Sequence, residues 1–246
     1  MLKSVLERNS PALVALSGGV DSSTLLAYAM RENIAVAAAT AVTEFAKPEE
    51  IDRAKNLAER LGVPWYPVKI SLLENAELRR NPANRCYICK KIIMGKLTET
   101  APLVGCDYVL DGSHADDLCE DRPGRDALIE LGVISPFQLA GLGKADIRGL
   151  ADELGVENTP ASSCLATRIP YNEEITLSKL ALVENAEKIM REAGIKGILR
   201  VRITFKNATI EVIEDEIDLA EENKNRLKPL GLQIIRVNEY KHGGNK

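Results

Sequence analysis

Short apolar runs alternate with amphipathic stretches from the N-terminus to about residue 170. The apolar runs have the length of buried strands, and the amphipathic stretches repeat their apolar residues at helical spacing. Strands that alternate with helices predict a parallel sheet with helices on both faces. The expected strands are 13–16, 35–42, 64–70 and 108–110, with 132–135 as a further candidate, and the expected helices are 1–9, 22–31, 49–61 and 145–154.

The pattern changes after about residue 170, which predicts a second, smaller domain. Thr176 is expected to cap a helix that ends at Gly194. The expected elements after it are strands 199–205 and 209–213 with a turn at 206–208, a helix over 217–227 and a strand over 233–237. We therefore expect an α/β domain over 1–170 and a small α+β domain over 171–246. The second domain would position a substrate or contact another subunit.

The first predicted strand runs through two glycines into a helix, within Val14–Ser23. Glycine adopts backbone angles closed to other residues, so such a turn can wrap closely around a ligand. The N–H groups of a first helical turn, together with the helix dipole, form a site that suits phosphate. The segment has neither the lysine of a Walker loop nor the third glycine of a dinucleotide fingerprint. It matches instead the SGGxDS signature of the PP-loop ATP pyrophosphatases, which cleave ATP between its α- and β-phosphates; the alternative is an ordinary glycine-rich turn.

In that superfamily the loop holds pyrophosphate, and Asp21 would be a catalytic residue near magnesium. The residues expected to bind ATP in this loop are Ser17, Gly18, Gly19, Val20, Asp21, Ser22 and Ser23. In parallel α/β sheets the ligand sits at the carboxyl ends of the strands. Both 17–22 and 111–113 follow predicted strands, so we expect one cleft to contain both.

The composition is that of an ordinary globular protein and restricts the function only a little. Of the 246 residues, 45% are hydrophobic and 28% are charged, and the formal net charge is −4. The acidic balance argues against a broad nucleic-acid footprint. No apolar run approaches the ~20 residues of a membrane span, and no signal-peptide pattern is present. We therefore expect a cytoplasmic protein with no membrane partner.

Five cysteines, an odd number unevenly spread, indicate a reducing compartment and metal-binding or reactive thiols. The two-residue spacer between Cys86 and Cys89 lets both thiolates reach one metal centre, and the basic residues beside them favour the thiolate form. Cys164 provides a third thiolate or stands alone as a reactive one. Three cysteines on a 4Fe-4S cluster would leave one iron open for sulfide or substrate. The alternatives are a structural zinc site or two unconnected thiols; Cys106 and Cys119 are expected to be a packing residue and an incidental loop thiol.

Five strings occur in one order: SGGVDSS, NPANRCYICKK, DGSHADD, ISPFQLAGLGKADIRGLADELG and PASSCLATRIPY. Together they resemble the LarE family, ATP-dependent sulfur transferases that mature the nickel-pincer nucleotide cofactor of lactate racemase. The resemblance implies a PP-loop domain, ATP and Mg²⁺, and pyridinium-3,5-biscarboxylic acid mononucleotide as substrate. ATP would adenylylate a ring carboxylate, and sulfur would displace AMP to give a thiocarboxylate. Members of the family form oligomers, so we expect a homo-oligomer.

The family uses two sulfur strategies. One branch has a single cysteine at the position of Cys164, which gives up its own sulfur and becomes dehydroalanine. The other has three cysteines that hold a 4Fe-4S cluster, whose open iron carries sulfide obtained from a sulfur donor. This chain has Cys86, Cys89 and Cys164. The resemblance therefore implies the cluster and makes Cys164 a ligand, although sacrificial use of its sulfur stays open.

The resemblance also implies roles for several charged residues. Arg200 and Arg202 would bind the phosphate of the mononucleotide, and alternation along a strand places both on one face. The alternative is two surface arginines. The other residues are Asp111, Ser113, Asp116 and Asp117, which would help to bind adenosine or magnesium, and Arg168 and Lys144, which would steady the triphosphate.

Two other functions compete with this interpretation. PP-loop enzymes with three-cysteine clusters also thiolate tRNA bases, although the acidic balance makes a nucleic-acid partner unexpected; tight, salt-sensitive binding to bulk tRNA would favour that function. A non-enzymatic ATP-binding module is the other alternative, and failure to release pyrophosphate with any acceptor would favour it.

Overall fold

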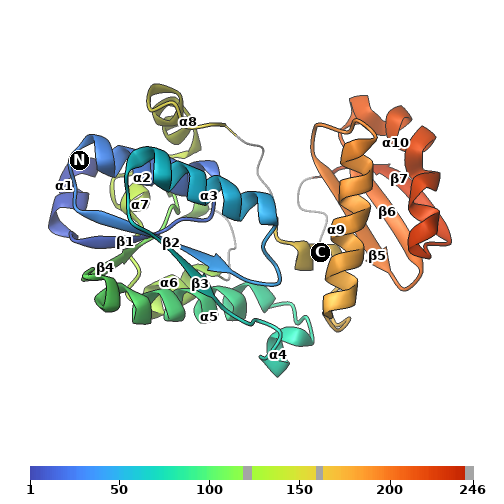
Figure 1. Cartoon of the computed structure of the whole chain (residues 1–246), viewed down its shortest axis with the longest axis horizontal. Coiled ribbons are helices and arrows are strands. Elements are labelled where there is room, and N and C mark those ends of the chain that lie inside the picture. The colour runs from blue at the N-terminus through green and yellow to red at the C-terminus, as the bar shows by residue number, and fades with distance from the viewer. Residues whose placement is uncertain (119–123, 159–162, 242–246) are drawn as a thin grey trace. The chain divides into compact units, whose positions relative to one another are not determined.

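The computed structural model describes residues 1–118, 124–158 and 163–241, which form two compact units (Figure 1). Unit 1 comprises Met1–Leu72 and Asn84–Ser162, and unit 2 comprises Leu73–Ala83 and Ser163–Lys246. This division differs in two places from the expected boundary at residue 170. Residues 163–170 belong to unit 2, and so does the short segment 73–83 from the middle of the chain.

Unit 1 is built on a four-stranded parallel sheet with the strand order β3-β2-β1-β4. The strands are β1 (Ala12–Ala15), β2 (Val36–Val42), β3 (Trp65–Lys69) and β4 (Tyr108–Leu110). The central strand β1 pairs with β2 on one side and β4 on the other. Because its side chains alternate between the two faces, Val14 packs into one hydrophobic core and Leu13 into the other. The predicted parallel α/β fold is confirmed.

Helices cover both faces of this sheet (Figure 1). One face carries α1 (Leu2–Arg8), α2 (Val20–Arg31), α3 (Pro48–Leu61), α7 (Pro136–Leu139) and α8 (Lys144–Glu153). The other carries α5 (Arg85–Thr100) and α6 (Gly124–Glu130). The pattern analysis did not predict α5, which buries Met94 and Leu97 against the sheet. The candidate strand at 132–135 is reduced to a single bridge between Ile134 and Leu110.

Unit 2 contains a three-stranded sheet in the order β5-β6-β7. Its strands are β5 (Leu199–Thr204), β6 (Asn207–Val212) and β7 (Ile234–Glu239); β5 and β6 are antiparallel, and β6 and β7 are parallel. The helices α9 (Leu177–Glu192) and α10 (Ile217–Asn223) pack against the sheet. The predicted cap is confirmed, because the Thr176 hydroxyl accepts a hydrogen bond from the Lys179 N–H (3.2 Å). The turn between β5 and β6 is shorter than predicted and leaves Asn207 in β6.

The segment 73–83 is joined to unit 2 by hydrogen bonds to residues far along the chain. It contains α4 (Ala76–Arg79). The Asn81 amide donates to the carbonyls of Ile169 (3.1 Å) and Pro170 (2.6 Å), and the Asn81 carbonyl accepts from the Asn172 N–H (2.9 Å). Asn81 is fully buried, so these bonds satisfy polar groups that water cannot reach.

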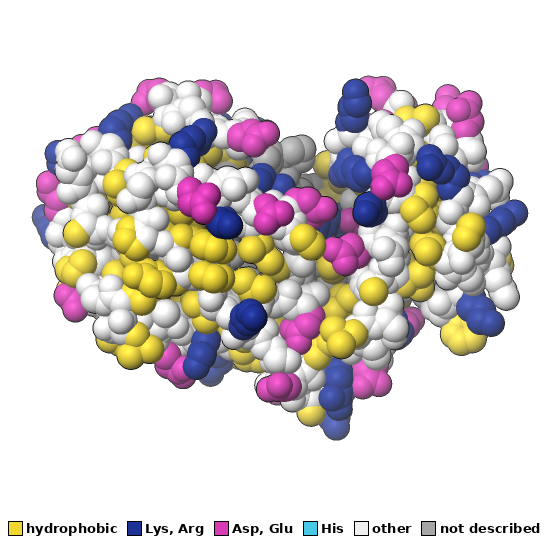
Figure 2. Space-filling view, viewed as in Figure 1, with side chains coloured by type: hydrophobic (Ala, Val, Ile, Leu, Met, Phe, Trp, Pro, Cys, Tyr) yellow, Lys and Arg dark blue, Asp and Glu magenta, His cyan; other side chains and the backbone are white. Residues whose placement is uncertain are grey.

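The visible surface of the protein mixes both signs of charge. Lysine, arginine, aspartate and glutamate side chains alternate over this face rather than gathering by sign (Figure 2). Among the described residues, no helix is long and apolar enough to cross a membrane.

Candidate active site

The PP-loop of unit 1, residues 17–23, joins the carboxyl end of β1 to α2. Gly18 has a φ of 76°, and its carbonyl accepts a hydrogen bond from Arg53 Nε (3.2 Å). A Cβ atom at this position would lie 2.0 Å from the backbone oxygen of Glu50. Only glycine fits here, because both the backbone angle and the close approach of α3 exclude a side chain.

The helix α2 begins at the PP-loop without a side-chain cap. Gly19 is its N-cap residue. The hydroxyls of Ser17 and Ser22 are 3.0 Å apart, and the Ser22 hydroxyl accepts from the Ser17 N–H (3.1 Å). The Ser22 hydroxyl also donates to the Gly19 carbonyl (3.3 Å), so the two hydroxyls fix the loop, and the N-terminus of α2 forms a cradle at the end of β1 that suits a phosphate group.

A second loop, residues 111–113 after β4, lies directly against this cradle. A Cβ atom on Gly112 would stand 2.8 Å from the backbone nitrogen of Ser22. The two loops predicted to share one cleft are therefore in backbone contact. The contact follows from the strand order, because β4 is the neighbour of β1 and both strands end at the same edge.

Asp111 organises the second loop from a buried position. Its carboxylate accepts hydrogen bonds from the Ser113 hydroxyl (2.6 Å), the Ser113 N–H (3.2 Å) and the Ser135 hydroxyl (2.6 Å). Lys90 Nζ lies 3.8 Å from Asp111 Oδ2. Sequence reasoning missed Ser135 and Lys90 as members of this site. The sequence contains a feature that could have indicated each of them. Ser135 ends a short apolar run, and Lys90 follows Cys86 by one helical turn. Binding of ATP by Asp111 and Ser113 stays a prediction.

The acidic residues after this loop hold the local fold. Asp116 accepts a hydrogen bond from the Lys144 N–H (2.7 Å) at the start of α8. Asp117 accepts from the His114 N–H (3.0 Å), and its Oδ1 lies 3.4 Å from His114 Nε2. Within the residues that the structure describes, no three His, Cys, Asp or Glu side chains are grouped to hold a metal ion. Magnesium binding by Asp21 and Asp117, and a triphosphate contact by Lys144, stay predictions.

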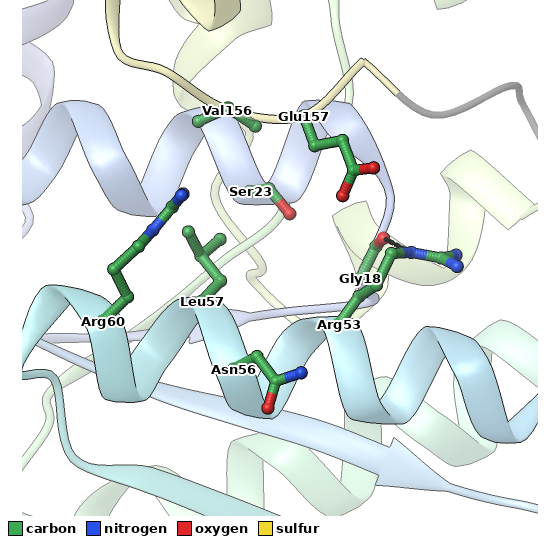
Figure 3. Close-up of a pocket in the computed structure, with 8 residues that line it drawn as sticks. All are labelled: Gly18, Ser23, Arg53, Asn56, Leu57, Arg60, Val156 and Glu157. Carbon is green, nitrogen blue, oxygen red and sulfur yellow. Dashed lines mark hydrogen bonds between the residues drawn. The ribbon is translucent and has the colours of Figure 1, made fainter.

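A pocket of about 190 Å³ adjoins the PP-loop between α2 and α3 (Figure 3). Arg53 crosses one end of it to reach the Gly18 carbonyl, and Arg60 donates to the Gly155 carbonyl (3.3 Å). The helix α3 thus holds the PP-loop through Arg53 and the segment after α8 through Arg60. The residues that line the pocket are Gly18, Ser23, Arg53, Asn56, Leu57, Arg60, Val156 and Glu157.

Cys86 and Cys89 lie in the first two turns of α5, also in unit 1. Cys86 is exposed and Cys89 is half-buried. Residues three apart share one face of a helix, and a helix N-terminus stabilises thiolates. Binding of an iron–sulfur cluster or a zinc ion by this pair stays a prediction. Cys106 is different: it is buried in the core, and desolvation raises the pKa of its thiol. Cys119 lies outside the described residues.

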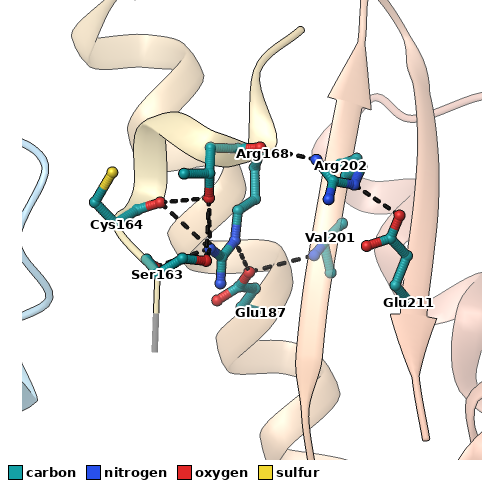
Figure 4. Close-up of polar contacts among 8 residues, drawn as sticks. Ser163, Cys164, Arg168, Glu187, Val201, Arg202 and Glu211 are labelled. Carbon is teal, nitrogen blue, oxygen red and sulfur yellow. Dashed lines mark hydrogen bonds and ion pairs between the residues drawn. The ribbon is translucent and has the colours of Figure 1, made fainter. Parts of the chain in front are cut away.

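Cys164 belongs to unit 2, where the neighbouring backbone is held by Arg168 (Figure 4). Arg168 Nη1 donates to the Ser163 carbonyl (2.8 Å), the Ser163 hydroxyl (2.6 Å) and the Thr167 hydroxyl (2.8 Å), and its Nε donates to Glu187 Oε1 (2.6 Å). The Cys164 sulfur points away from this cluster (Figure 4). Arg168 is 2% exposed, so its guanidinium is enclosed by protein groups. The expectation that Arg168 steadies the triphosphate is replaced by a structural role in the loop that carries Cys164.

The two arginines of β5 have different surroundings. Arg202 donates to Glu211 Oε1 (2.6 Å) and to the Thr167 carbonyl (2.9 Å). The Arg200 side chain makes no hydrogen bond or ion pair with the described part of the chain, but lies over the Tyr240 ring, 4.5 Å from its centroid. Burial lowers the pKa of Arg200. Arg202 therefore joins β5 to the Cys164 loop, and Arg200 keeps donors for an anion, although phosphate binding by either stays a prediction.

Comparison with known proteins identifies the family. A family model described as asparagine synthase matches residues 2–86, the part that holds the PP-loop. The pyridinium-3,5-bisthiocarboxylic acid mononucleotide synthase of Lactiplantibacillus plantarum, a LarE protein, is 35% identical over 91% of this chain and 84% of its own length. The chain belongs to the LarE family. The predicted family is thus confirmed, and this LarE-family protein is an ATP-dependent sulfur transferase.

Matches to other nucleotide-dependent enzymes are shorter or more distant. The tRNA-specific 2-thiouridylase MnmA of Desulfitobacterium hafniense is 29% identical over 49% of the LarE-family chain and 38% of its own length. The 7-cyano-7-deazaguanine synthase of Bacillus subtilis is 29% identical over 60% of the chain and 79% of its own length. The match to the mononucleotide synthase therefore extends along nearly the whole LarE-family chain, whereas the match to the tRNA-specific 2-thiouridylase covers about half of it.

Proposed function

We propose that this protein uses ATP to convert a carboxylate of pyridinium-3,5-biscarboxylic acid mononucleotide into a thiocarboxylate. The observation that carries the proposal is that two thiols lie on α5, the helix whose Lys90 pairs with the loop packed against the PP-loop, all within unit 1. Cys86 and Cys89 share a helix with Lys90, which is ion-paired with Asp111 of the adjoining loop. A phosphate site and a pair of cysteines within one unit suit a reaction that activates an acid with ATP and then adds sulfur.

The chemistry follows from what each group can do. A carboxylate is a poor electrophile, so its oxygen first attacks the α-phosphorus of ATP, and pyrophosphate leaves. The PP-loop donors hold the two phosphates that depart as pyrophosphate. A sulfur nucleophile then attacks the acyl carbon of the adenylate, and the C–O bond to AMP breaks. The same two steps on the second carboxylate would give the bisthiocarboxylate.

A three-cysteine cluster is the sulfur source that we favour. Cys86, Cys89 and Cys164 would hold the 4Fe-4S cluster, which would supply sulfide bound to the open iron. The paired thiols at the start of α5 support this choice over the sacrificial one, because a single disposable sulfur needs no second and third cysteine. Arg200, with its donors available on β5, would hold the phosphate of the mononucleotide.

We expect the protein to form AMP and pyrophosphate, and not ADP and phosphate, when it is given ATP, Mg²⁺ and the dicarboxylate mononucleotide. The products can be separated by anion-exchange chromatography. Asp21→Asn should suppress both products, because a carboxylate at the start of α2 would be lost from the phosphate site. Asp152→Asn is the control, since this aspartate is exposed on α8. ADP as the main product, or no turnover by the wild-type protein, would exclude the proposal.

We further expect anaerobically purified protein to contain ~4 iron atoms per chain. Supplied with sulfide, it should make several product molecules per chain and leave Cys164 chemically intact. Cys86→Ala and Cys89→Ala should abolish iron binding, whereas Cys106→Ala should not, because that thiol is buried in the core. Intact-mass analysis tests the sacrificial alternative, which requires Cys164 to become lighter by ~34 Da through loss of hydrogen sulfide. Stoichiometric dehydroalanine in a protein without iron would contradict the cluster.

A further inference from the structure

We propose that Lys90 is a catalytic residue that contacts the phosphates of ATP, an inference that rests on the proposed function. The PP-loop itself contains no lysine or arginine, although ATP brings a highly charged triphosphate to it. In Walker loops a lysine within the loop meets this charge. Here the structure supplies a lysine from a different element, α5, at the same edge of the sheet.

The position of Lys90 is built by its neighbours. Its side-chain stem lies along Gly124, where an added Cβ would be 3.6 Å from Lys90 Cβ and 3.7 Å from Cγ. Its ammonium group is 3.8 Å from Asp111 Oδ2. The residue after Asp111 is Gly112, which lies against the backbone nitrogen of Ser22 in the first turn of α2. Lys90 is therefore connected to the phosphate cradle by one short chain of contacts.

The hydrogen-bonding capacity of Lys90 is not used by Asp111. The Asp111 carboxylate already accepts three hydrogen bonds from Ser113 and Ser135, and 3.8 Å is too long for a fourth. Within the described residues, the Lys90 side chain forms no hydrogen bond, and it is 35% exposed. Asp111 thus holds the charge in place while the three N–H donors of the ammonium group stay available for a ligand.

The next residue shows what a purely structural lysine looks like on the same helix. Lys91 donates to Glu130 (2.7 Å) and to the Tyr87 hydroxyl (3.0 Å), and it forms its ion pair with Glu130 at the surface. Its charge is neutralised by a close partner. Lys90, by contrast, has only a distant partner whose oxygens are occupied, which is the arrangement expected of a cation that awaits an anionic ligand.

Binding of α,β-methylene-ATP, which cannot be cleaved to pyrophosphate, tests the proposal. We expect Lys90→Met to weaken binding by about 10- to 100-fold, as for loss of a charge-assisted contact, and Lys90→Arg to recover part of it. Lys96→Met is the matched control on the same helix, because Lys96 pairs with Glu99 at the surface, and its affinity should stay within twofold of wild type. Isothermal titration calorimetry gives the dissociation constants.

Acetylation of the wild-type protein provides a test that does not depend on the folding of a variant. The ATP analogue should slow acetylation of Lys90 at least fivefold, measured by peptide mass spectrometry, and leave Lys96 unaffected. Equal affinities for wild type and Lys90→Met, or no protection of Lys90 by the bound analogue, would overturn the proposal. A wild-type protein that does not bind the analogue would instead refute the proposed function itself, so the two failures are distinguishable.

Discussion

Replacing Gly112 with alanine is expected to reduce pyrophosphate release by about a hundredfold or more. The added methyl group would stand 2.8 Å from the Ser22 nitrogen and 3.0 Å from the Asp21 carbonyl carbon. Both neighbours are backbone atoms of the first turn of α2, which cannot rotate away as a side chain would. The loop after β4 must therefore move off the PP-loop, and a displacement of about 1 Å at a site of phosphate chemistry costs roughly this factor.

The rate of pyrophosphate release by Gly112→Ala, compared with wild type at saturating ATP, provides the measurement. Gly149→Ala is the control, because Gly149 lies in α8 and a Cβ there would meet nothing within 4 Å. That substitution should leave activity unchanged and stabilise the helix by about 0.5–1 kcal/mol. Wild-type activity in Gly112→Ala would show that the contact between the two loops does not shape the site.

Replacing Arg168 with methionine is expected to lower the stability of unit 2 by about 3–5 kcal/mol. The change removes one member of a buried ion pair and leaves the Glu187 carboxylate, 6% exposed, without its charged partner. It also removes the donors that hold Ser163 and Thr167 beside Cys164. Glu187→Gln should cost less, because an amide oxygen can still accept from the Val201 N–H (3.2 Å).

Hydrogen exchange followed by mass spectrometry can assign this loss to unit 2. Peptides from α9 and β5 should lose protection in Arg168→Met, while the single tryptophan, Trp65 in β3 of unit 1, reports on the other unit by fluorescence. Lys179→Met, which removes a partly exposed pair between α9 and Glu173 in the segment before it, should cost about 1 kcal/mol or less. Unchanged protection in α9 and β5 would mean that the buried pair contributes little.

The sequence pattern was sufficient to predict features that depend only on residues close together in the chain. The apolar run at β1, the two glycines after it and the amphipathic α2 predicted a strand, a phosphate-binding turn and a helix, because each is decided within a few residues. Parallel strand order then implied that the loop after β4 shares the cleft. The helix α5 was not predicted because its surface lysines and inner apolar residues form only a weak helical stripe.

Contacts between residues distant in sequence could not be predicted in this way. The family resemblance implied that Arg168 steadies the triphosphate, yet its partner is Glu187, on a helix that begins nine residues later. Arg53 and the Gly18 carbonyl are likewise brought together only by the packing of α3 on the PP-loop. A single sequence states which residues can be charged or apolar, but not which ones the fold will place opposite each other.

The inclusion of residues 73–83 in unit 2 has a consequence for how this protein is made. This segment leaves the ribosome long before Ile169, Pro170 and Asn172, the residues that Asn81 binds. Protein synthesis proceeds at about 5–20 residues per second. Asn81 therefore stays exposed to water for several seconds before its partners are made. Truncation at the apparent domain boundary would remove it permanently. An isolated C-terminal fragment that begins at Ser163 should therefore be difficult to produce in folded form, unless residues 73–83 are supplied as a peptide or joined to it by circular permutation.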